Sequence, residues 1–259
     1  MTNLVDWDLA VTLGSRIAGP GPDVSGEEAA AAVVELRDHA NASTALVRDF
    51  TGLDAPDGTA PVLVVDRRGW IQANASGFSV LMGPLLDKVT EKKGTPTGIT
   101  AEIGSRVTGA EVGMMLGFLG TKVLGQFDPF FEPAGRLLLV APNIVHVERE
   151  LGVDTRDFRL WVCLHEETHR VQFTANPWLG DHLRDQMGGL VETIEPRAII
   201  DGLRNAAGAI RGEGGSIMDL LSTPEQKEIL DRITGVMSLL EGHADVVMDG
   251  VGPSVIPSV

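Results

Sequence analysis

The spacing of apolar and polar positions along the chain predicts a mainly helical fold with a small β-sheet, an α+β class. Apolar residues that recur at every third or fourth position are typical of helices with one buried face. Short β-branched runs between turn residues are typical of strands. We predict helices over 29–53, 70–89, 109–126, 143–151, 157–173, 178–207 and 224–248, and strands over 61–66 and 136–140.

Capping and breaking residues set several of these boundaries. Residues 25–28 (Ser-Gly-Glu-Glu) and 223–226 (Thr-Pro-Glu-Gln) have the pattern of a capping box, in which side chains satisfy the first free amides of a helix. A break or kink is predicted near Gly83-Pro84, and the polar stretch 90–98 is predicted to be a loop. Either Asp154 or Thr155 is suited to cap the helix that follows.

The chain is predicted to form one domain over 1–259. We expect an N-terminal helical part over about 1–135, a metal-site part over about 136–249 and a C-terminal tail over 250–259. The Gly-rich stretch 211–216 is the best linker in the sequence. It is not expected to separate domains, because the site developed below takes residues from both sides of it.

The longest membrane-like stretch, 112–121, offers only ten uncharged residues, whereas a spanning helix needs about 20. In the helix predicted over 109–126, Gly109, Gly113 and Gly117 recur at every fourth position. On a helix these positions share one face. We therefore predict a buried helix whose glycines let another element approach closely, and no membrane span.

Composition and charge exclude several classes of protein. The chain has 21 basic and 36 acidic residues, a net charge of −15, and a mean hydropathy of +0.10. Nucleic acids and anionic membranes need a positive surface, so neither is an expected partner. The single cysteine, Cys163, excludes an intrachain disulfide, and burial of an inert thiol is expected. The N-terminal residues carry no secretory pattern, which predicts a cytoplasmic location.

The chemistry of the chain is carried by residues 165–169, His-Glu-Glu-Thr-His, an H-E-x-x-H motif. On a helix His165 and His169 lie one turn apart on the same face, where both imidazoles can reach one Zn²⁺ ion. Glu166 lies about 100° further around the helix, where a carboxylate can flank the metal and act as a general base. Glu167, about 200° from His165, is expected to face elsewhere.

A catalytic zinc ion needs a third protein ligand and an open fourth position. Glu241 and Asp245 stand at i and i+4 of the last predicted helix, so both carboxylates project from one face. The same face carries Ile233, Met237 and Met248, and we expect this stripe to be buried. His243 is the alternative ligand if the helix is broken at Gly242.

The H-E-x-x-H motif followed by a Glu-x-x-x-Asp pair resembles the gluzincins, the thermolysin type of metallopeptidase. That resemblance implies that Glu241 is the third zinc ligand and that Asp245 orients His165 through a hydrogen bond. The separation of His169 from Glu241 is much longer than in thermolysin. Thermolysin-like enzymes also place a Tyr and a His beside the metal, and this chain has no Tyr. Arg170 and three histidines could replace the missing donor: His146, His182 and His243.

Two longer stretches, 160–173 and 237–249, together resemble a bacterial family of zincin-like hydrolases and metallopeptidases. The segments 5–7, 18–22 and 65–74 are similar to it as well. The likeness is closest to a branch associated with biosynthesis of the deazaflavin coenzyme F-420. It implies a zincin-like fold and a zinc site, and it names no substrate.

Two functions from different classes follow. The first is a zinc-dependent hydrolase in which Glu166 activates water for attack on an amide or peptide carbonyl. The second is a non-catalytic protein, stabilised by zinc, that binds a partner or assists coenzyme biosynthesis. The weakest interpretation is a degenerate zincin that binds no metal.

Overall fold

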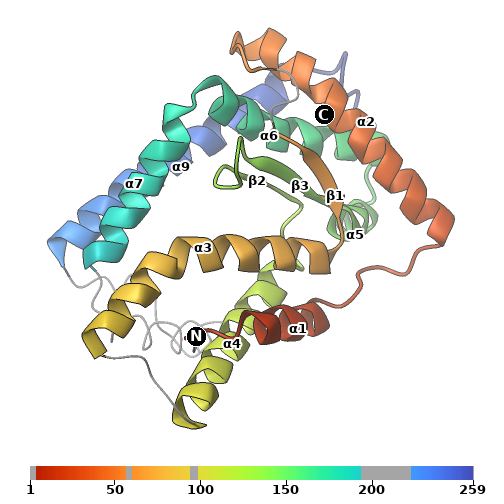
Figure 1. The fold of residues 1–259 in the computed structure, drawn as a ribbon. Coiled ribbons are helices and arrows are strands. Elements are labelled where there is room, and N and C mark those ends of the chain that lie inside the picture. Colours follow the sequence, from red (N-terminus) through yellow and green to blue (C-terminus); the bar gives the residue numbers. More distant parts are fainter. Residues whose placement is uncertain (1–3, 57–59, 94–98, 194–222, 259) are drawn as a thin grey trace. The chain divides into compact units, whose positions relative to one another are not determined.

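The computed structural model describes residues 4–56, 60–93, 99–193 and 223–258, and it confirms a mainly helical fold with one small sheet (Figure 1). The helices are α1 (Trp7–Ala18), α2 (Gly26–Thr51), α3 (Arg67–Lys93), α4 (Ile99–Leu119), α5 (Ala141–Leu151), α6 (Thr155–Ala175), α7 (Trp178–Thr193) and α9 (Pro224–Gly250). The strands are β1 (Val62–Val65), β2 (Gly125–Asp128) and β3 (Arg136–Val140).

The predicted caps are confirmed. The Ser25 hydroxyl accepts a hydrogen bond from the Glu28 amide, and the Glu28 carboxylate accepts one from the Ser25 amide. Asp154, rather than Thr155, caps α6 by accepting from the Asp157 amide. The side chains of Thr223 and Gln226 bind each other's backbone amides at the start of α9. Each cap satisfies amide groups that the helix itself leaves free.

Three predictions about helix ends are wrong. α3 is a single helix that passes through Gly83-Pro84 and continues to Lys93, so residues 90–93 are not in a loop. This continuity excludes a break at Gly83-Pro84, whereas a kink there, which an interior proline usually causes, stays a prediction. α4 begins at Ile99 instead of 109 and ends at Leu119, and residues 125–126, the end of the predicted helix, belong to strand β2. α1 was not predicted. Residues 94–98 and 194–222, which include the rest of the predicted 178–207 helix and the 211–216 linker, lie outside the described residues.

The chain divides into two compact units: 1–19, 67–121 and 186–232 form the first, and 20–66, 122–185 and 233–259 form the second. In the first unit, α1 and α4 meet backbone to backbone. A Cβ atom on Gly113 would lie 2.7 Å from the Ala10 carbonyl oxygen, and one on Gly117 would lie 2.8 Å from that of Gly14. The glycine stripe therefore does let another element approach closely, as predicted. The single-domain arrangement stays a prediction.

The second unit contains the sheet, in the order β1-β3-β2. β1 runs parallel to β3, with Val62 opposite Leu137, and β2 runs antiparallel to β3, with Gly125 opposite Leu139. Leu36 and Ala40 of α2 and Val162 and Cys163 of α6 pack with Leu139 of β3 in one core cluster. α6 is thereby fixed against the sheet by buried aliphatic side chains.

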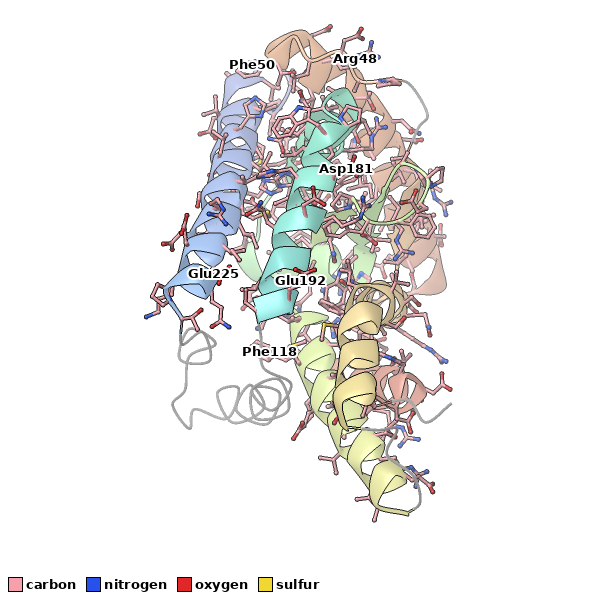
Figure 2. All side chains as sticks on the ribbon, turned by 60° about the vertical axis from the view of Figure 1, so that its left-hand side comes forward. Arg48, Phe50, Phe118, Asp181, Glu192 and Glu225 are labelled. Atoms are coloured by element: carbon pink, nitrogen blue, oxygen red, sulfur yellow. The ribbon has the colours of Figure 1, made fainter. Side chains whose placement is uncertain are left out.

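A second core cluster in this unit joins α2, α6, α9 and the C-terminal tail. Its buried members include Val47, Leu164, Val247 and Ile256. The Phe50 ring at the end of α2 fills the space above Gly250, where a Cβ atom would meet ring carbons at 2.1 Å (Figure 2). The C-terminal tail contributes to this core, since Ile256 is 1% exposed.

Among the described residues, no helix combines the length and the apolar character needed to cross a bilayer.

Candidate metal centre

The H-E-x-x-H motif lies in the middle of α6, the helix packed between the sheet, α2 and α9. Leu160, Leu164 and Val171 of this helix are at most 4% exposed. Because α6 is held on several sides, the side chains of the motif project in defined directions. His165 and His169 point towards α9, and Glu167 points towards α2.

Three donor atoms meet at this point: Nε2 of His165, Nε2 of His169 and Oε2 of Glu241. The two nitrogens are 3.1 Å apart, and they lie 3.3 Å and 3.5 Å from the Glu241 oxygen. In a tetrahedral zinc site with bonds of about 2.0–2.1 Å, the ligand atoms are roughly 3.3–3.4 Å from one another. The three atoms therefore already have the spacing that zinc requires, and the residues fit the ion.

These three residues are the group of described His, Cys, Asp and Glu side chains whose ligand atoms converge closely enough to hold a metal. α9 carries Glu241 to the site by packing Leu240, Ala244, Val247 and Met248 into the core. The predicted buried stripe is confirmed only in part: Met248 is 4% exposed, but Met237 is 41% exposed and the Glu241 side chain is 50% exposed. Glu241 lies at the edge of the buried face, with its carboxylate turned towards the histidines.

Gln172 determines which nitrogen of His169 faces the site. Its Nε2 donates to the Leu240 carbonyl at 3.0 Å and to His243 Nδ1 at 2.8 Å, so its Oε1 is the atom 3.0 Å from His169 Nδ1. An amide oxygen only accepts, and therefore His169 Nδ1 must carry the proton. In the neutral ring, Nε2 then presents a lone pair to the metal position.

His165 is oriented by a different group. Its Nδ1 lies 3.0 Å from the sulfur of Met248, while the exposed Asp245 acts on the ring through its charge. Burial lowers the pKa of His165, the neighbouring His169 lowers it further, and the charges of Glu241 and Asp245 partly oppose them. A lowered pKa favours the neutral imidazole, which is the form that binds a metal.

Glu166 is 7% exposed and lies against the start of β2. Burial raises the pKa of its carboxyl to about 8, with a further contribution from the negative charge of Glu241. A Cβ atom on Gly125 would lie 2.5 Å from Glu166 Cγ and 2.7 Å from Oε1. Glycine at this position therefore provides the room that the Glu166 side chain occupies.

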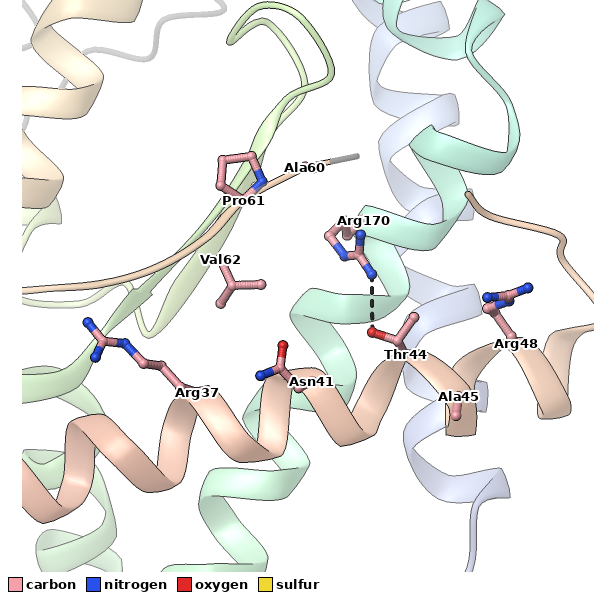
Figure 3. A pocket seen from close by; sticks show the side chains of 9 residues that line it. All are labelled: Arg37, Asn41, Thr44, Ala45, Arg48, Ala60, Pro61, Val62 and Arg170. Atoms are coloured by element: carbon pink, nitrogen blue, oxygen red, sulfur yellow. Dashed lines mark hydrogen bonds between the residues drawn. The ribbon is translucent and has the colours of Figure 1, made fainter. Parts of the chain in front are cut away.

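Glu167 faces away from the two histidines, as predicted. It is fully buried and binds Arg170 Nε through both carboxylate oxygens, and it accepts a hydrogen bond from the Thr44 hydroxyl at 2.7 Å. Arg170 also donates to Thr44, as Figure 3 shows. Because Arg170 is held on the α2 side of the helix, it is not placed to act beside the metal position.

Two of the other predicted donors, His146 and His182, have partners of their own. His146 on α5 is 3.7 Å from Glu150 and half exposed, and His182 on α7 stacks edge-on against Trp178. His243 is close to the centre, since it shares Gln172 with His169. Cys163 is fully buried and points at the Leu36 carbonyl, as expected of an inert thiol.

Sequence reasoning missed Gln172, Gly125 and Met248. A signal for Gln172 exists, because it stands three positions after His169 and a helix places i and i+3 side by side. Gly125 contacts the motif from an element distant in sequence, and no local pattern marks it. Met248 was expected to be buried on the Glu241 face of its helix, but its contact with His165 was not predicted.

Two histidines on one helix, a carboxylate from a later helix that meets them and a buried glutamate beside them are the arrangement expected of a zincin. The chain belongs to the zincin-like metallopeptidase family, whose model matches residues 5–259. A crystal structure of a candidate hydrolase with a novel fold from Chloroflexus aurantiacus is similar to this chain. The TM-score is 0.69 with 29% sequence identity, over 98% of this chain and 72% of that one. A search of curated proteins found no match.

Proposed function

We propose that this protein is a zinc-dependent hydrolase of amide or peptide bonds, with His165, His169 and Glu241 as the metal ligands. The observation that carries the proposal is the mutual spacing of the three donor atoms, 3.1–3.5 Å, which matches the edges of a zinc tetrahedron. Three ligands, rather than four, are typical of catalytic zinc sites, in which the fourth position takes water or substrate.

When bound, zinc would polarise the substrate carbonyl and lower the pKa of water to about 7. Glu166 is the residue of this chain suited to take the proton from that water, since it is adjacent to His165 and shielded from solvent. Its raised pKa, about 8 with no cation present, lies near neutral pH, where a general base and acid works best. A nearby cation lowers the pKa of a carboxyl, which favours the basic form at neutral pH.

We further propose that His243 supplies the polar donor that thermolysin-like enzymes take from other side chains. Gln172 donates to His243 Nδ1, so the proton of the neutral ring sits on Nε2. An N–H group near the metal position could stabilise the negative charge that develops on the carbonyl oxygen. His243 is preferred to Arg170, whose guanidinium is bound to Glu167.

The alternative function is a zinc-stabilised binding or accessory protein without turnover, and the absence of tyrosine from the chain favours it. The narrower association with biosynthesis of the deazaflavin coenzyme belongs to this alternative and stays a prediction from the sequence resemblance. Both functions share the same ligands, so metal binding alone does not distinguish them.

The test combines metal analysis with a turnover assay. The purified protein and its Glu166→Gln and Glu241→Ala variants are analysed for zinc by mass spectrometry, and each is incubated with a library of internally quenched peptides. We expect one zinc per chain in the parent protein and in Glu166→Gln, and little in Glu241→Ala. Hydrolysis should fall by about 10²–10⁴-fold in Glu166→Gln, the usual contribution of a general base.

A matched control is Glu225→Gln, which removes the same charge from an exposed position at the start of α9. It should keep both zinc and activity. Full activity in Glu166→Gln would reject the assigned base. Zinc in the parent protein with no cleavage of any library member would favour the accessory function, and zinc retained by Glu241→Ala would reject the ligand set.

A further inference from the structure

A second site is indicated by a cavity of about 550 Å³ in the unit that contains the sheet. It lies between α2, the residues that lead into β1, and α6 (Figure 3). Its volume is in the range typical of small-molecule sites. Its polar lining residues include Arg37, Asn41, Thr44, Arg48 and Arg170.

The charge of the lining is opposite to that of the protein as a whole. Arg37, Arg48 and Arg170 line the cavity, and none of the lining residues that the structure describes is acidic. The whole chain has only 21 basic residues and a net charge of −15. Glu167 offsets the charge of Arg170, and Asp54 offsets that of Arg48. The attraction for an anion therefore comes from Arg37 and from the N–H donors of all three guanidinium groups.

Arg170 is the fixed element of this cavity. Arg170 is 4% exposed. Its Nε donates to the Glu167 carboxylate, and its Nη2 donates to the Thr44 hydroxyl. Within the described part of the chain, Arg170 Nη1 donates no hydrogen bond. It is also not among the fully enclosed polar atoms without a partner, so it keeps some exposure to solvent. Because the rest of the guanidinium is fixed, Nη1 is a donor held in one orientation, which reduces the entropy cost of binding an anion there.

The remaining polar groups come from one face of α2. Arg37, Asn41, Thr44 and Arg48 follow one another at spacings of three or four residues, so they line the cavity along about 16 Å of helix. Arg48 is 3.3 Å from Asp54, whose side chain is 96% exposed, and exposed pairs of this kind are weak. Arg37 and Asn41 are exposed, so their side chains can adjust to a ligand.

We propose that this cavity binds a small organic anion that carries two or more carboxylate or phosphate groups. Arginine recognises both groups through paired N–H donors. One anionic group would bind Arg170 Nη1, and another would bind Arg37. The site is separate from the metal centre, because Arg170 and Glu167 project towards α2 whereas His165 and His169 project towards Glu241 on α9.

The test is calorimetric titration of the metal-loaded protein with inorganic triphosphate and, separately, with citrate, at constant ionic strength. We expect saturable binding at one site, at least tenfold weaker in Arg37→Gln and in Asn41→Asp. The second variant places a carboxylate in the cavity with little change of shape. Tighter binding of triphosphate would identify the natural ligand as a phosphate compound, and tighter binding of citrate would identify it as a polycarboxylate.

Each of these two charge changes has a control variant with the same change of charge at a position outside the cavity. Arg106→Gln removes a positive charge from the exposed face of α4, and Gln72→Glu adds a negative charge on α3. Both should bind the anion as the parent protein does. Equal weakening in the controls, unchanged binding in Arg37→Gln and Asn41→Asp, or absence of saturable binding overturns the proposal. Because both probes chelate zinc, the titration is repeated with metal-free protein, and affinity that disappears with the metal also overturns it.

Discussion

Gly125 and Glu166 fit together so closely that one methyl group on the glycine would lie 2.5 Å from the glutamate side chain. The φ angle of Gly125 is outside the left-handed region, so the requirement for glycine comes from this contact and not from the backbone. β2 therefore determines where the proposed general base lies.

We predict that Gly125→Ala destabilises the protein by about 1–3 kcal/mol, the usual cost of overpacking a buried position. The measurement is urea unfolding of a double-mutant cycle with Glu166→Ala. In that background the cost should fall to about 0.5 kcal/mol or less, because the side chain that the methyl group meets has been removed. An equal cost in both backgrounds would show that the contact with Glu166 is not the reason for the glycine.

Gln172 is predicted to control the affinity for zinc without being a ligand. Gln172→Leu removes the acceptor that holds the proton on His169 Nδ1, and loss of such a partner usually weakens metal binding by about 10–100-fold. The dissociation constant is measured by competition with a chromogenic chelator. Gln186→Leu on α7 is the control and should leave the affinity unchanged. Parent-like affinity in Gln172→Leu, with the fold intact by circular dichroism, contradicts the prediction.

The C-terminal tail is predicted to be anchored in a pH-dependent way by Asp157. Burial alone would raise the pKa of Asp157, but hydrogen bonds from the Ser258 amide and from Arg156 outweigh it and lower the pKa below its ordinary 3.8. A lowered pKa in the folded state stabilises the fold above the unfolded value. This contribution is lost as the pH falls through the folded value.

Accordingly, Asp157→Asn should lower the melting temperature by a few degrees at pH 7, and the difference from the parent protein should shrink steadily below about pH 4. Calorimetric scans over this pH range provide the measurement. Asp38→Asn, an exposed change of the same charge on α2, should have little effect at any pH. If the difference in melting temperature between Asp157→Asn and the parent protein grows as the pH falls, the proposed role of Asp157 as an anchor is contradicted.

Cys163 is predicted to be unreactive in the folded protein. Burial raises the pKa of its thiol, and the negative charges of Glu166, Glu167 and Glu35 raise it further, so the reactive thiolate is not populated at neutral pH. A disulfide reagent such as Ellman's should label no thiol in the native protein and one thiol in concentrated urea. Rapid stoichiometric labelling of the native protein would contradict the burial of this side chain.

Local sequence patterns predicted the features that depend on neighbours within one helix. The capping box at Ser25 and Glu28, the glycine stripe of α4 and the shared face of His165 and His169 all follow from spacings of three or four residues. The i, i+4 pair on α9 also identified Glu241, which the structure places beside both histidines.

Features that depend on distant pairing were not predicted. β2 forms because residues 125–128 pair with β3, and nothing in those four residues by themselves favours a strand over the end of a helix. The partner of His165 Nδ1 is Met248 rather than the expected Asp245, because the rotation of α9 is set by Leu240, Ala244 and Val247 in the core. Which side of a helix is buried depends on what packs against it, and the sequence of that helix alone does not specify this.

The hydrogen bond from Gln172 to the Leu240 carbonyl has a consequence for the tolerance of this chain to insertions. Glu241 is the next residue, and adding or deleting one residue just after Leu240 would turn the carboxylate by about 100° around the axis of α9. Length changes in this part of α9 should therefore abolish metal capture even when every ligand is kept. The proposed metal centre therefore depends on the rotational position of Glu241 on α9, relative to Leu240, as well as on the identity of its side chains.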